Sequence, residues 1–237
     1  MVVFIPARGG SKGIIGKNLS LIGGKPLIVH TLDLCRELIG INVIKGDSVL
    51  VSTDDAEIAT VCASNGFATS YRRPTELATD DSQVVDAVLH GIAWYDKAFG
   101  RSTSDVMMLQ PTSPLRRLQD VQHAVDCYRA KRHSSLVSVA PLREHPYESI
   151  ELSEDNQRWH FLRKSERAPS GRQGYPSNFG FIDGSIYIAS LPFLKEHKSF
   201  LVENQTMPFL VDQRYPIDID DPEDLMVADC LFRSSRK

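Results

Sequence analysis

The chain has 237 residues and a net charge of −3 at pH 7. That length is enough for one well-buried α/β domain with a small appendage, and we expect residues 1–237 to form one domain. The slightly acidic balance gives no general attraction to nucleic acid, so anions must bind at local clusters of cations. No run approaches the ~18 apolar residues of a membrane span, and the apolar run at 2–5 is too short for a signal peptide. We therefore expect a cytoplasmic protein whose partners are neither nucleic acid nor membrane.

The four cysteines lie far apart, and each falls in a segment that is expected to be helical. Zinc sites and disulfide frameworks need closer grouping or a secretory context, so we expect four buried, reduced thiols. The seven histidines form no H-x-x-x-H pair, and we assign them no role. The cysteines are Cys35, Cys62, Cys127 and Cys230.

Short apolar runs alternate with amphipathic segments along most of the chain, which is typical of βαβ units and a mainly parallel sheet. The expected strands are residues 2–6, 48–52, 67–71, 105–109, 135–140, 184–189 and 208–211. Helices are expected from about Pro26, after the capping residues 53–55, and over 80–98, 118–131 and 221–233.

The stretch 142–183 differs from the rest, because it is polar, loop-rich and without regular periodicity. It contains candidate short strands near 147–152 and 159–162. An irregular insert of this length inside a compact domain is unusual unless it is functional or meets a partner.

Glycines and cations are concentrated directly after the first expected strand, in I-P-A-R-G-G-S-K-G-I-I-G-K-N at 5–18. Glycine lets the backbone turn through positive φ and approach a ligand closely. Free backbone amides can cradle a polyphosphate, which Arg8, Lys12 and Lys17 would neutralise. The alternative is a solvated basic turn, which is disfavoured because neighbouring cations repel one another without an anion. The stretch therefore predicts a triphosphate-binding loop.

Two well-known phosphate-binding loops do not match this stretch. A P-loop needs a glycine five positions before its Gly-Lys pair and a Ser or Thr after the lysine. Those positions hold Ser11 and Asn18 here. A dinucleotide fingerprint needs G-x-G-x-x-G, which the glycines at 9, 10, 13 and 16 do not give.

Ligands of open α/β sheets bind outside the carboxyl ends of the strands. The loops after the expected strands 2–6, 48–52, 67–71 and 105–109 should therefore share one crevice. Their polar side chains come from distant parts of the sequence and are Arg8, Lys12, Lys17, Asp54, Arg72, Arg73 and Gln110.

The 5–18 stretch resembles the signature of the acylneuraminate cytidylyltransferases, also called CMP-sialic acid synthetases, although Ile15 stands where the family often has proline. The resemblance implies a Rossmann-like, three-layer α/β/α nucleotidyltransferase domain. It also implies a reaction that joins CTP to a nine-carbon sugar acid and releases pyrophosphate. The residues implied at the nucleotide are Arg8 and Lys12 on the triphosphate, helped by Gly9, Gly10, Ser11, Lys17 and Asn18.

Residues 72–82 resemble the family's R-R-P-x-E-L-A-x-D segment, which holds the nucleotide through an arginine and a serine. The matching residues are Arg72, Arg73 and Ser82. An arginine pair by itself is usually a solvated surface feature. The sequence leaves open which of the two points inward.

Gln110 ends an expected buried strand and begins the run Q-P-T-S-P. A glutamine can both donate and accept hydrogen bonds, which suits a polyhydroxy sugar. The matching family residue contacts the sugar acid. The alternative is a turn made by Pro111 and Pro114, which Gln110 merely caps.

The end of the insert resembles the family's R-Q-x-x-P-x-x-Y-x-x-N-G-x-x-Y. The resemblance implies that Arg172 binds the sugar carboxylate through a two-pronged pairing that lysine cannot reproduce. Arg163 and Arg167 compete for that task. Phe179 is expected beside the sugar, and it and Asp183 depart from the family's tyrosine and asparagine. These departures concern the exact sugar more than the reaction.

The run P-I-D-I-D-D-P at 216–222 resembles the family's D-I-D-x-P segment. In an extended backbone, Asp218 and Asp220 project to the same side. Two hard oxygen ligands suit Mg²⁺ bound to phosphates, and the resemblance implies Mg²⁺ at these residues. The alternative is an acidic turn that caps the last helix, a role that also suits Asp221.

The sequence as a whole predicts transfer of CMP from CTP to the anomeric hydroxyl of a nonulosonic acid. No residue stands out as a general base, and Asp220 is the candidate because carboxylates near the attacking oxygen are scarce. Alternatives are a cytidylyltransferase for another sugar acid (legionaminic, pseudaminic, Kdn or Kdo type), a uridylyltransferase, or a non-catalytic nucleotide-binding regulator. A regulator should have lost Lys12, Asp218 or Asp220, and all three are present. The family's insert reaches across a dimer interface, so a homodimer with 142–183 at that interface is also implied.

Overall fold

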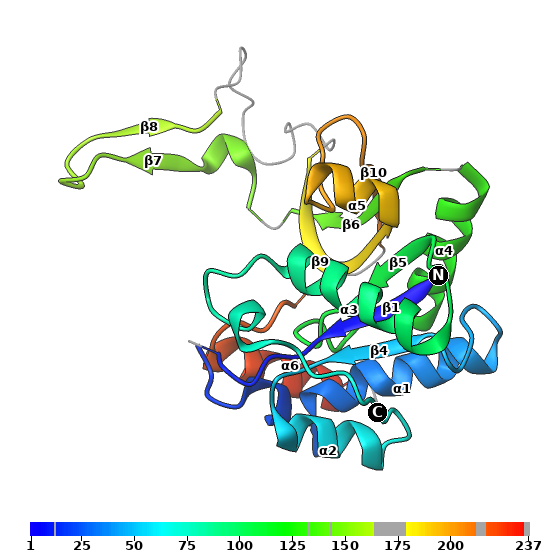
Figure 1. Cartoon of the computed structure of the whole chain (residues 1–237). Coiled ribbons are helices and arrows are strands. Elements are labelled where there is room, and N and C mark those ends of the chain that lie inside the picture. Colours follow the sequence, from blue (N-terminus) through cyan, green and yellow to red (C-terminus); the bar gives the residue numbers. More distant parts are fainter. Residues whose placement is uncertain (12, 132, 143, 164–178, 212–216, 235–237) are drawn as a thin grey trace.

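The computed structural model describes the chain except for residues 12, 132, 143, 164–178, 212–216 and 235–237. Its centre is a six-stranded sheet of order β10-β6-β9-β5-β1-β4 (Figure 1). β9 pairs antiparallel with both of its neighbours, and the other pairs are parallel, which confirms the mostly parallel sheet. The strands are β1 (Val2–Pro6), β4 (Val49–Ser52), β5 (Asp105–Met108), β6 (Ser135–Pro141), β9 (Gly180–Ser190) and β10 (Met207–Leu210).

Helices cover both faces of this sheet, and the alternation along β1 decides which side chains meet them. Val3 and Ile5 are buried on the face covered by α1 and α4, whereas Val2 and Phe4 are buried on the face covered by α3. Successive strand side chains point to opposite faces, so an all-apolar strand lies between two helical layers. The three-layer α/β/α fold is confirmed. The helices are α1 (Leu27–Gly40), α2 (Ala56–Ser64), α3 (Val84–Phe99), α4 (Leu118–Lys131), α5 (Leu191–His197) and α6 (Pro222–Ser234).

Two helices next to the site begin at acidic caps that the sequence predicted. Asp55 Oδ1 accepts hydrogen bonds from the backbone amides of Glu57 and Ile58, at 2.7 and 3.0 Å. Asp221 Oδ1 accepts from the amide of Asp224 at 2.9 Å. Such contacts satisfy amides that have no partner within the helix.

The strand expected at 67–71 does not form. Tyr71 is buried, but its amide donates to Thr69 Oγ1 at 3.1 Å instead of joining a ladder. The next backbone contact runs from Arg73 N to Thr53 O, at 2.9 Å, beyond the end of β4. Burial of the Tyr71 side chain therefore holds the segment, and β4 remains the edge of the sheet.

The helix expected from residue 80 begins only at Val84. The carbonyl of Thr79 is occupied by side-chain donors from Arg8 and Ser82, which keeps residues 79–82 out of the helix. α5 has no counterpart among the expected helices, although Ser190 Oγ caps it by accepting from Phe193 N at 3.3 Å. No helix in the described residues is both long enough and apolar enough to cross a membrane.

The cysteines are only partly as expected. Cys35 and Cys62 are buried, and desolvation raises the pKa of each thiol to about 12. Cys127 is half-buried and Cys230 is exposed, so the expectation of four buried thiols is wrong for these two. In α6 the buried residue is Ala228, and Cys230 faces outward.

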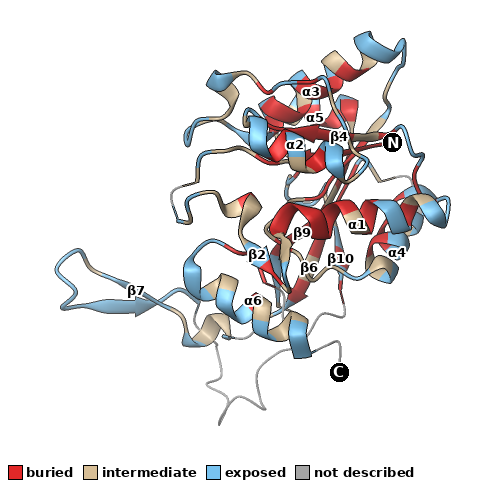
Figure 2. Cartoon of the chain, turned by 90° about the horizontal axis from the view of Figure 1, so that it is seen from below, coloured by how far each residue is buried: buried red, intermediate tan, exposed pale blue. Residues whose placement is uncertain are grey.

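Within the insert, β7 (Ile150–Leu152) and β8 (Trp159–Phe161) pair as an antiparallel hairpin, which confirms both short strands. The hairpin projects away from the sheet (Figures 1 and 2). Every residue of its two strands is exposed.

Candidate active site

A pocket of about 270 Å³ opens at the carboxyl ends of β1 and β5. Its walls come from the loop after β1, the segment 73–84, the turn at 110–112 and the segment 218–220. The expected crevice therefore forms between the segments after 2–6, 67–71 and 105–109. The loop after 48–52, with Asp54, does not line it, and neither do Gly9 and Arg72. The predicted site residues that line it are Arg8, Gly10, Ser11, Lys17, Asn18, Arg73, Ser82, Gln110, Asp218 and Asp220.

The loop after β1 is held in place by contacts within the protein. Gly9 N donates to Asp54 Oδ1 and Asn18 Nδ2 donates to the carbonyl of Arg8, both at 2.9 Å. A Cβ at Gly13 would lie 2.0 Å from the carbonyl oxygen of Asp220. Glycine at 13 is therefore what lets this loop approach the 218–220 segment so closely. Lys12, predicted at the triphosphate, lies outside the described residues.

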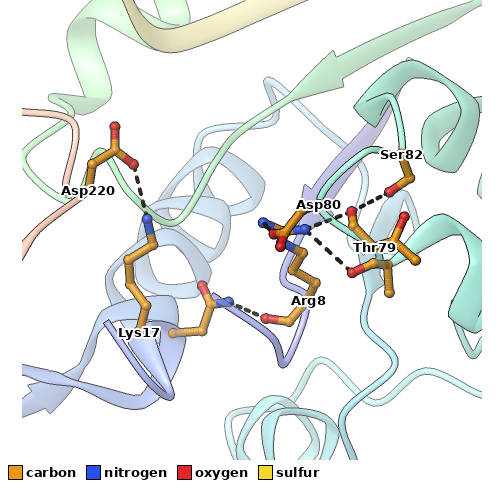
Figure 3. A network of polar contacts seen from close by, with 8 residues as sticks. Arg8, Lys17, Thr79, Asp80, Ser82 and Asp220 are labelled. Carbon is orange, nitrogen blue, oxygen red and sulfur yellow. Dashed lines mark hydrogen bonds and ion pairs between the residues drawn. The ribbon is translucent and has the colours of Figure 1, made fainter. Parts of the chain in front are cut away.

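Arg8 crosses the pocket to the segment before α3 (Figure 3). Its Nη1 donates to the carbonyl of Thr79 at 2.7 Å, and its Nη2 lies 2.8 Å from Asp80 Oδ1. Ser82 Oγ donates to the same Thr79 carbonyl at 2.7 Å. Two residues predicted at the nucleotide thus meet on one carbonyl oxygen.

Arg73 is the member of the arginine pair that points inward. It is 6% exposed, whereas Arg72 is exposed. Its Nε donates to Ser52 Oγ and its Nη2 to the Ser52 carbonyl, both at 2.9 Å. Burial lowers the pKa of Arg73. The charge of Asp54 favours the charged form of Arg73, but no carboxylate in the described part of the chain forms an ion pair with it. The pocket is therefore lined by a buried cation that is not directly paired.

The segment 217–220 alternates as the sequence predicted. Ile217 and Ile219 are buried, while Asp218 and Asp220 between them line the pocket. Lys17 Nζ donates to the Ile219 carbonyl at 2.7 Å and lies 3.2 Å from Asp220 Oδ1 (Figure 3). Desolvation raises the pKa of Asp218, and the negative charge of Asp220 acts in the same direction. The Asp218 side chain is also exposed towards the pocket.

Gln110 takes part in a turn and also lines the pocket. Its carbonyl accepts a hydrogen bond from Ser113 N at 3.4 Å, which makes the turn, and the residue also lines the pocket. Ile219 N donates to the Thr112 carbonyl at 2.9 Å and so fastens the same turn to the acidic segment.

Two residues predicted at the sugar acid lie away from this pocket. The guanidinium carbon of Arg163 lies 5.0 Å from the centre of the Phe179 ring. That ring packs edge-on against His145 and Tyr147, at centroid distances of 5.0 and 5.7 Å. The structure therefore groups Arg163 and Phe179 in an aromatic cluster of the insert. Arg167 and Arg172 lie outside the described residues.

Several pocket residues were assigned no role from the sequence. Asp80 belongs to the R-R-P-x-E-L-A-x-D segment, yet no sequence feature indicated that it pairs with Arg8. The remaining additional residues each lie next to, or within a few positions of, a residue of a motif named above. The additional lining residues are Pro6, Leu77, Thr79, Asp80, Val84, Pro111 and Thr112.

Comparisons with known proteins agree with this geometry. A family model described as cytidylyltransferase matches residues 2–158. The CMP-N,N'-diacetyllegionaminic acid synthase of Legionella pneumophila is 32% identical over 240 residues, which covers 100% of this chain and 98% of that protein. This chain belongs to the cytidylyltransferase family.

Other relatives of this cytidylyltransferase are more distant. The N-acylneuraminate cytidylyltransferase of Streptococcus agalactiae serotype V is 27% identical over 95% of this chain, which spans 51% of that relative. A solved structure of CMP:2-keto-3-deoxy-manno-octonic acid synthetase complexed with CTP matches with a TM-score of 0.69 and 17% identity, covering 99% of this chain and 98% of that one. These relatives confirm the resemblance to the acylneuraminate cytidylyltransferases, and the solved structure confirms the nucleotidyltransferase fold.

Proposed function

We propose that this cytidylyltransferase transfers CMP from CTP to the anomeric hydroxyl of a nonulosonic acid and releases pyrophosphate. The observation that carries the proposal is Arg73, a buried guanidinium without a carboxylate partner in the described residues, in the pocket that Arg8 and Lys17 also line. Burying a cation that no carboxylate pairs directly is costly. A nucleotide offsets that cost, because its phosphates and base oxygen accept charge-assisted hydrogen bonds.

The roles follow the positions of the side chains around the pocket. Arg8, Lys12 and the amides of Gly10 and Ser11 would hold the triphosphate, whereas the Gly9 amide is engaged by Asp54 Oδ1. Asn18, Arg73 and Ser82 would hold the rest of the nucleotide, and Gln110 would orient the sugar acid. In-line attack on the α-phosphorus needs positioning and charge neutralisation more than covalent help from the protein.

Mg²⁺ is proposed at Asp218 and Asp220. Both carboxylates line the pocket from the same side of the segment, next to Lys17. The described residues contain no group of three or more acidic, cysteine or histidine side chains suited to a metal. Two carboxylates fit Mg²⁺ nevertheless, because it commonly takes its other ligands from substrate phosphates and water. The ion would supply charge neutralisation at the phosphates.

The sugar acid is proposed only as a class. Relatives carry the names of N,N'-diacetyllegionaminic, N-acylneuraminic and pseudaminic acid enzymes. Pyrophosphate release should be measured with Mg²⁺, CTP and each of these acids, with UTP as the control nucleotide. Release with CTP and one acid supports the proposal, and release with UTP alone contradicts it. We place the reaction in the cytoplasm, where CTP is available.

We also propose that the chain acts as a homodimer through the insert 142–183. Leu152, Trp159 and Phe161 of the hairpin are 53%, 56% and 40% exposed, and a projecting apolar hairpin is typical of an interface. A partner's insert could then bring Arg163, Arg172 and Phe179 towards this pocket. Sedimentation equilibrium should give a dimer, and Trp159→Glu should shift it to monomer while His160→Ala, on the same strand, does not. A monomeric wild-type chain would contradict this assembly.

A further inference from the structure

β9 departs from regular pairing next to the pocket. It pairs Ile182 with Val139 and Tyr187 with Val137 of β6. Four residues of β9, which we call the 183–186 bulge, therefore lie opposite the single residue Ser138. Bulges of this kind occur near active sites, where they redirect the chain.

The tip of the 183–186 bulge lies against two residues of the pocket. Gly184 has a φ of 71°, a conformation that favours glycine. A Cβ built there would lie 3.4 Å from Asp218 Oδ2 and 3.8 Å from Gln110 Nε2. The backbone of Gly184 thus borders the space between the proposed metal ligand and the proposed sugar contact.

Asp183 fixes the bulge from its buried side. The side chain is 3% exposed and accepts hydrogen bonds from Ser138 Oγ and from Ser185 Oγ, the latter at 2.8 Å. Ser138 Oγ in turn accepts from Ile186 N at 2.8 Å. The hydroxyls and carboxylate replace the ladder hydrogen bonds that the bulge interrupts, so few backbone groups are left unsatisfied.

Arg116 fixes the bulge from the opposite side. Its Nη1 donates to the Ser185 carbonyl at 3.0 Å, and its Nη2 donates to Thr31 Oγ1 of α1 at 2.7 Å. Arg116 lies on the same connection after β5 that carries Gln110. The connection between β5 and α4 therefore supplies both the pocket residue Gln110 and Arg116, which holds the 183–186 bulge beside it. We call Arg116 and Asp183, which hold this bulge from two sides, the brace.

The brace also balances charge. No cation in the described part of the chain forms an ion pair with Asp183. Desolvation lowers the pKa of Arg116 to about 10, so it remains a cation at neutral pH, and the charges of Asp183 and Asp218 favour that form. A buried charge that loses its counter-charge is strongly destabilised.

We propose that Arg116 and Asp183 are positioning residues for the sugar-acid side of the pocket. They hold the 183–186 bulge from two sides and so set the spacing between Gln110 and Asp218 at Gly184. The inference rests on the proposed function, because it assigns the side of the pocket formed by Gly184, Gln110 and Asp218 to the sugar acid. It predicts that removing a contact of Arg116 or Asp183 raises the KM for the sugar acid more than the KM for CTP.

The test measures KM for CTP and for the sugar acid separately, together with the melting temperature. The probes are N-acetylneuraminic, N,N'-diacetyllegionaminic and pseudaminic acids. Arg116→Lys keeps the charge but lacks the planar fork whose two nitrogens reach Ser185 and Thr31 separately, and Ser138→Ala removes one anchor of Asp183. The matched controls are Arg101→Lys, where Arg101 donates to Tyr95 Oη at 3.2 Å, and Ser135→Ala, on the same strand, where Ser135 Oγ donates to the Phe200 carbonyl at 2.5 Å.

We expect each brace variant to raise the KM for the sugar acid about tenfold, with the KM for CTP changed by less than about twofold. The controls should leave both constants unchanged. Equal loss for both substrates, or loss that only follows a lower melting temperature, would mean a merely structural role and overturn the inference. If Arg116→Lys fails to fold, Thr31→Val removes only the Nη2 acceptor and should raise the same KM. A wild-type chain that turns over no sugar acid would overturn the proposed function and this inference together, whereas unaffected variants overturn the inference alone.

Discussion

Arg8 Nη2 lies 2.8 Å from Asp80 Oδ1, so a cation proposed for the triphosphate is paired with a carboxylate across the pocket (Figure 3). The two side chains are 33% and 38% exposed. Ion pairs this exposed contribute about 0–1 kcal/mol. A triphosphate can therefore compete for Arg8 at little cost, while the bond from Arg8 to the Thr79 carbonyl keeps the guanidinium in the pocket.

This relationship leads to a prediction for Asp80→Asn. The change removes a negative charge beside the proposed triphosphate and leaves Arg8 less tightly engaged. The KM for CTP should fall by about two- to fivefold, which corresponds to the small free energy of an exposed pair. Steady-state kinetics at varied CTP provides the measurement. A tenfold rise in this KM would contradict the prediction and would show that the Arg8–Asp80 pair is needed to shape the nucleotide site.

The two neighbouring arginines provide a matched comparison. Arg73→Lys loses the fork that bonds Ser52 at two atoms, and a lysine cannot reproduce it. We expect the KM for CTP to rise about 10- to 100-fold. Arg72→Lys, at the exposed neighbour, should change it by less than about twofold. Equal effects of the two substitutions would contradict the inward role of Arg73.

Lys12 is expected to act on the triphosphate as charge develops during the reaction. Lys12→Ala should therefore lower turnover about 100-fold or more, the usual effect of removing one stabilising donor. Lys45→Ala, at an exposed position before β4, serves as the control. Circular dichroism should show both variants folded. Turnover that stays unchanged in Lys12→Ala would remove this assignment.

Asp218 gives a prediction for stability against pH. Desolvation raises its pKa in the folded chain above the ordinary value of 3.8. The folded state then binds more protons than the unfolded state between these two pKa values, so Asp218 lowers stability as pH rises through its folded pKa. Without Mg²⁺, Asp218→Asn should raise the melting temperature at pH 7.5, and the gain should vanish below pH 3.8. Asp126→Asn, exposed on α4, is the control. A lower melting temperature at neutral pH would contradict the sign of this shift.

Much of the fold could be predicted because its strands are recognisable as short apolar runs in the sequence. β1 is apolar at both faces, and that pattern requires helices on two sides. The strand predicted at 67–71 is wrong because Tyr71 is buried without pairing in the sheet. An apolar pattern alone does not distinguish a buried strand from a buried irregular segment. The start of α3 was misplaced because donors from Arg8 occupy the carbonyl of Thr79, a contact between residues far apart in the sequence.

The candidate site was predictable as a set of loops but not as a set of contacts. The glycines and cations of 5–18 identify the loop, and sheet topology places Gln110 near it. The choice between Arg72 and Arg73 required the contact with Ser52, which no local pattern encodes. The brace at Arg116 was also invisible, because it joins two connections and a helix only in the folded chain.

The most direct test of the account is to detect the product itself. Wild-type chain, Mg²⁺, CTP and the nonulosonic acids should be incubated together, and the mixture analysed by mass spectrometry for CMP joined to the sugar acid. The account predicts this conjugate in equal amount to pyrophosphate, and its disappearance when UTP replaces CTP. Pyrophosphate accompanied by free CMP, with no conjugate for any acid, would contradict transfer to a sugar acid.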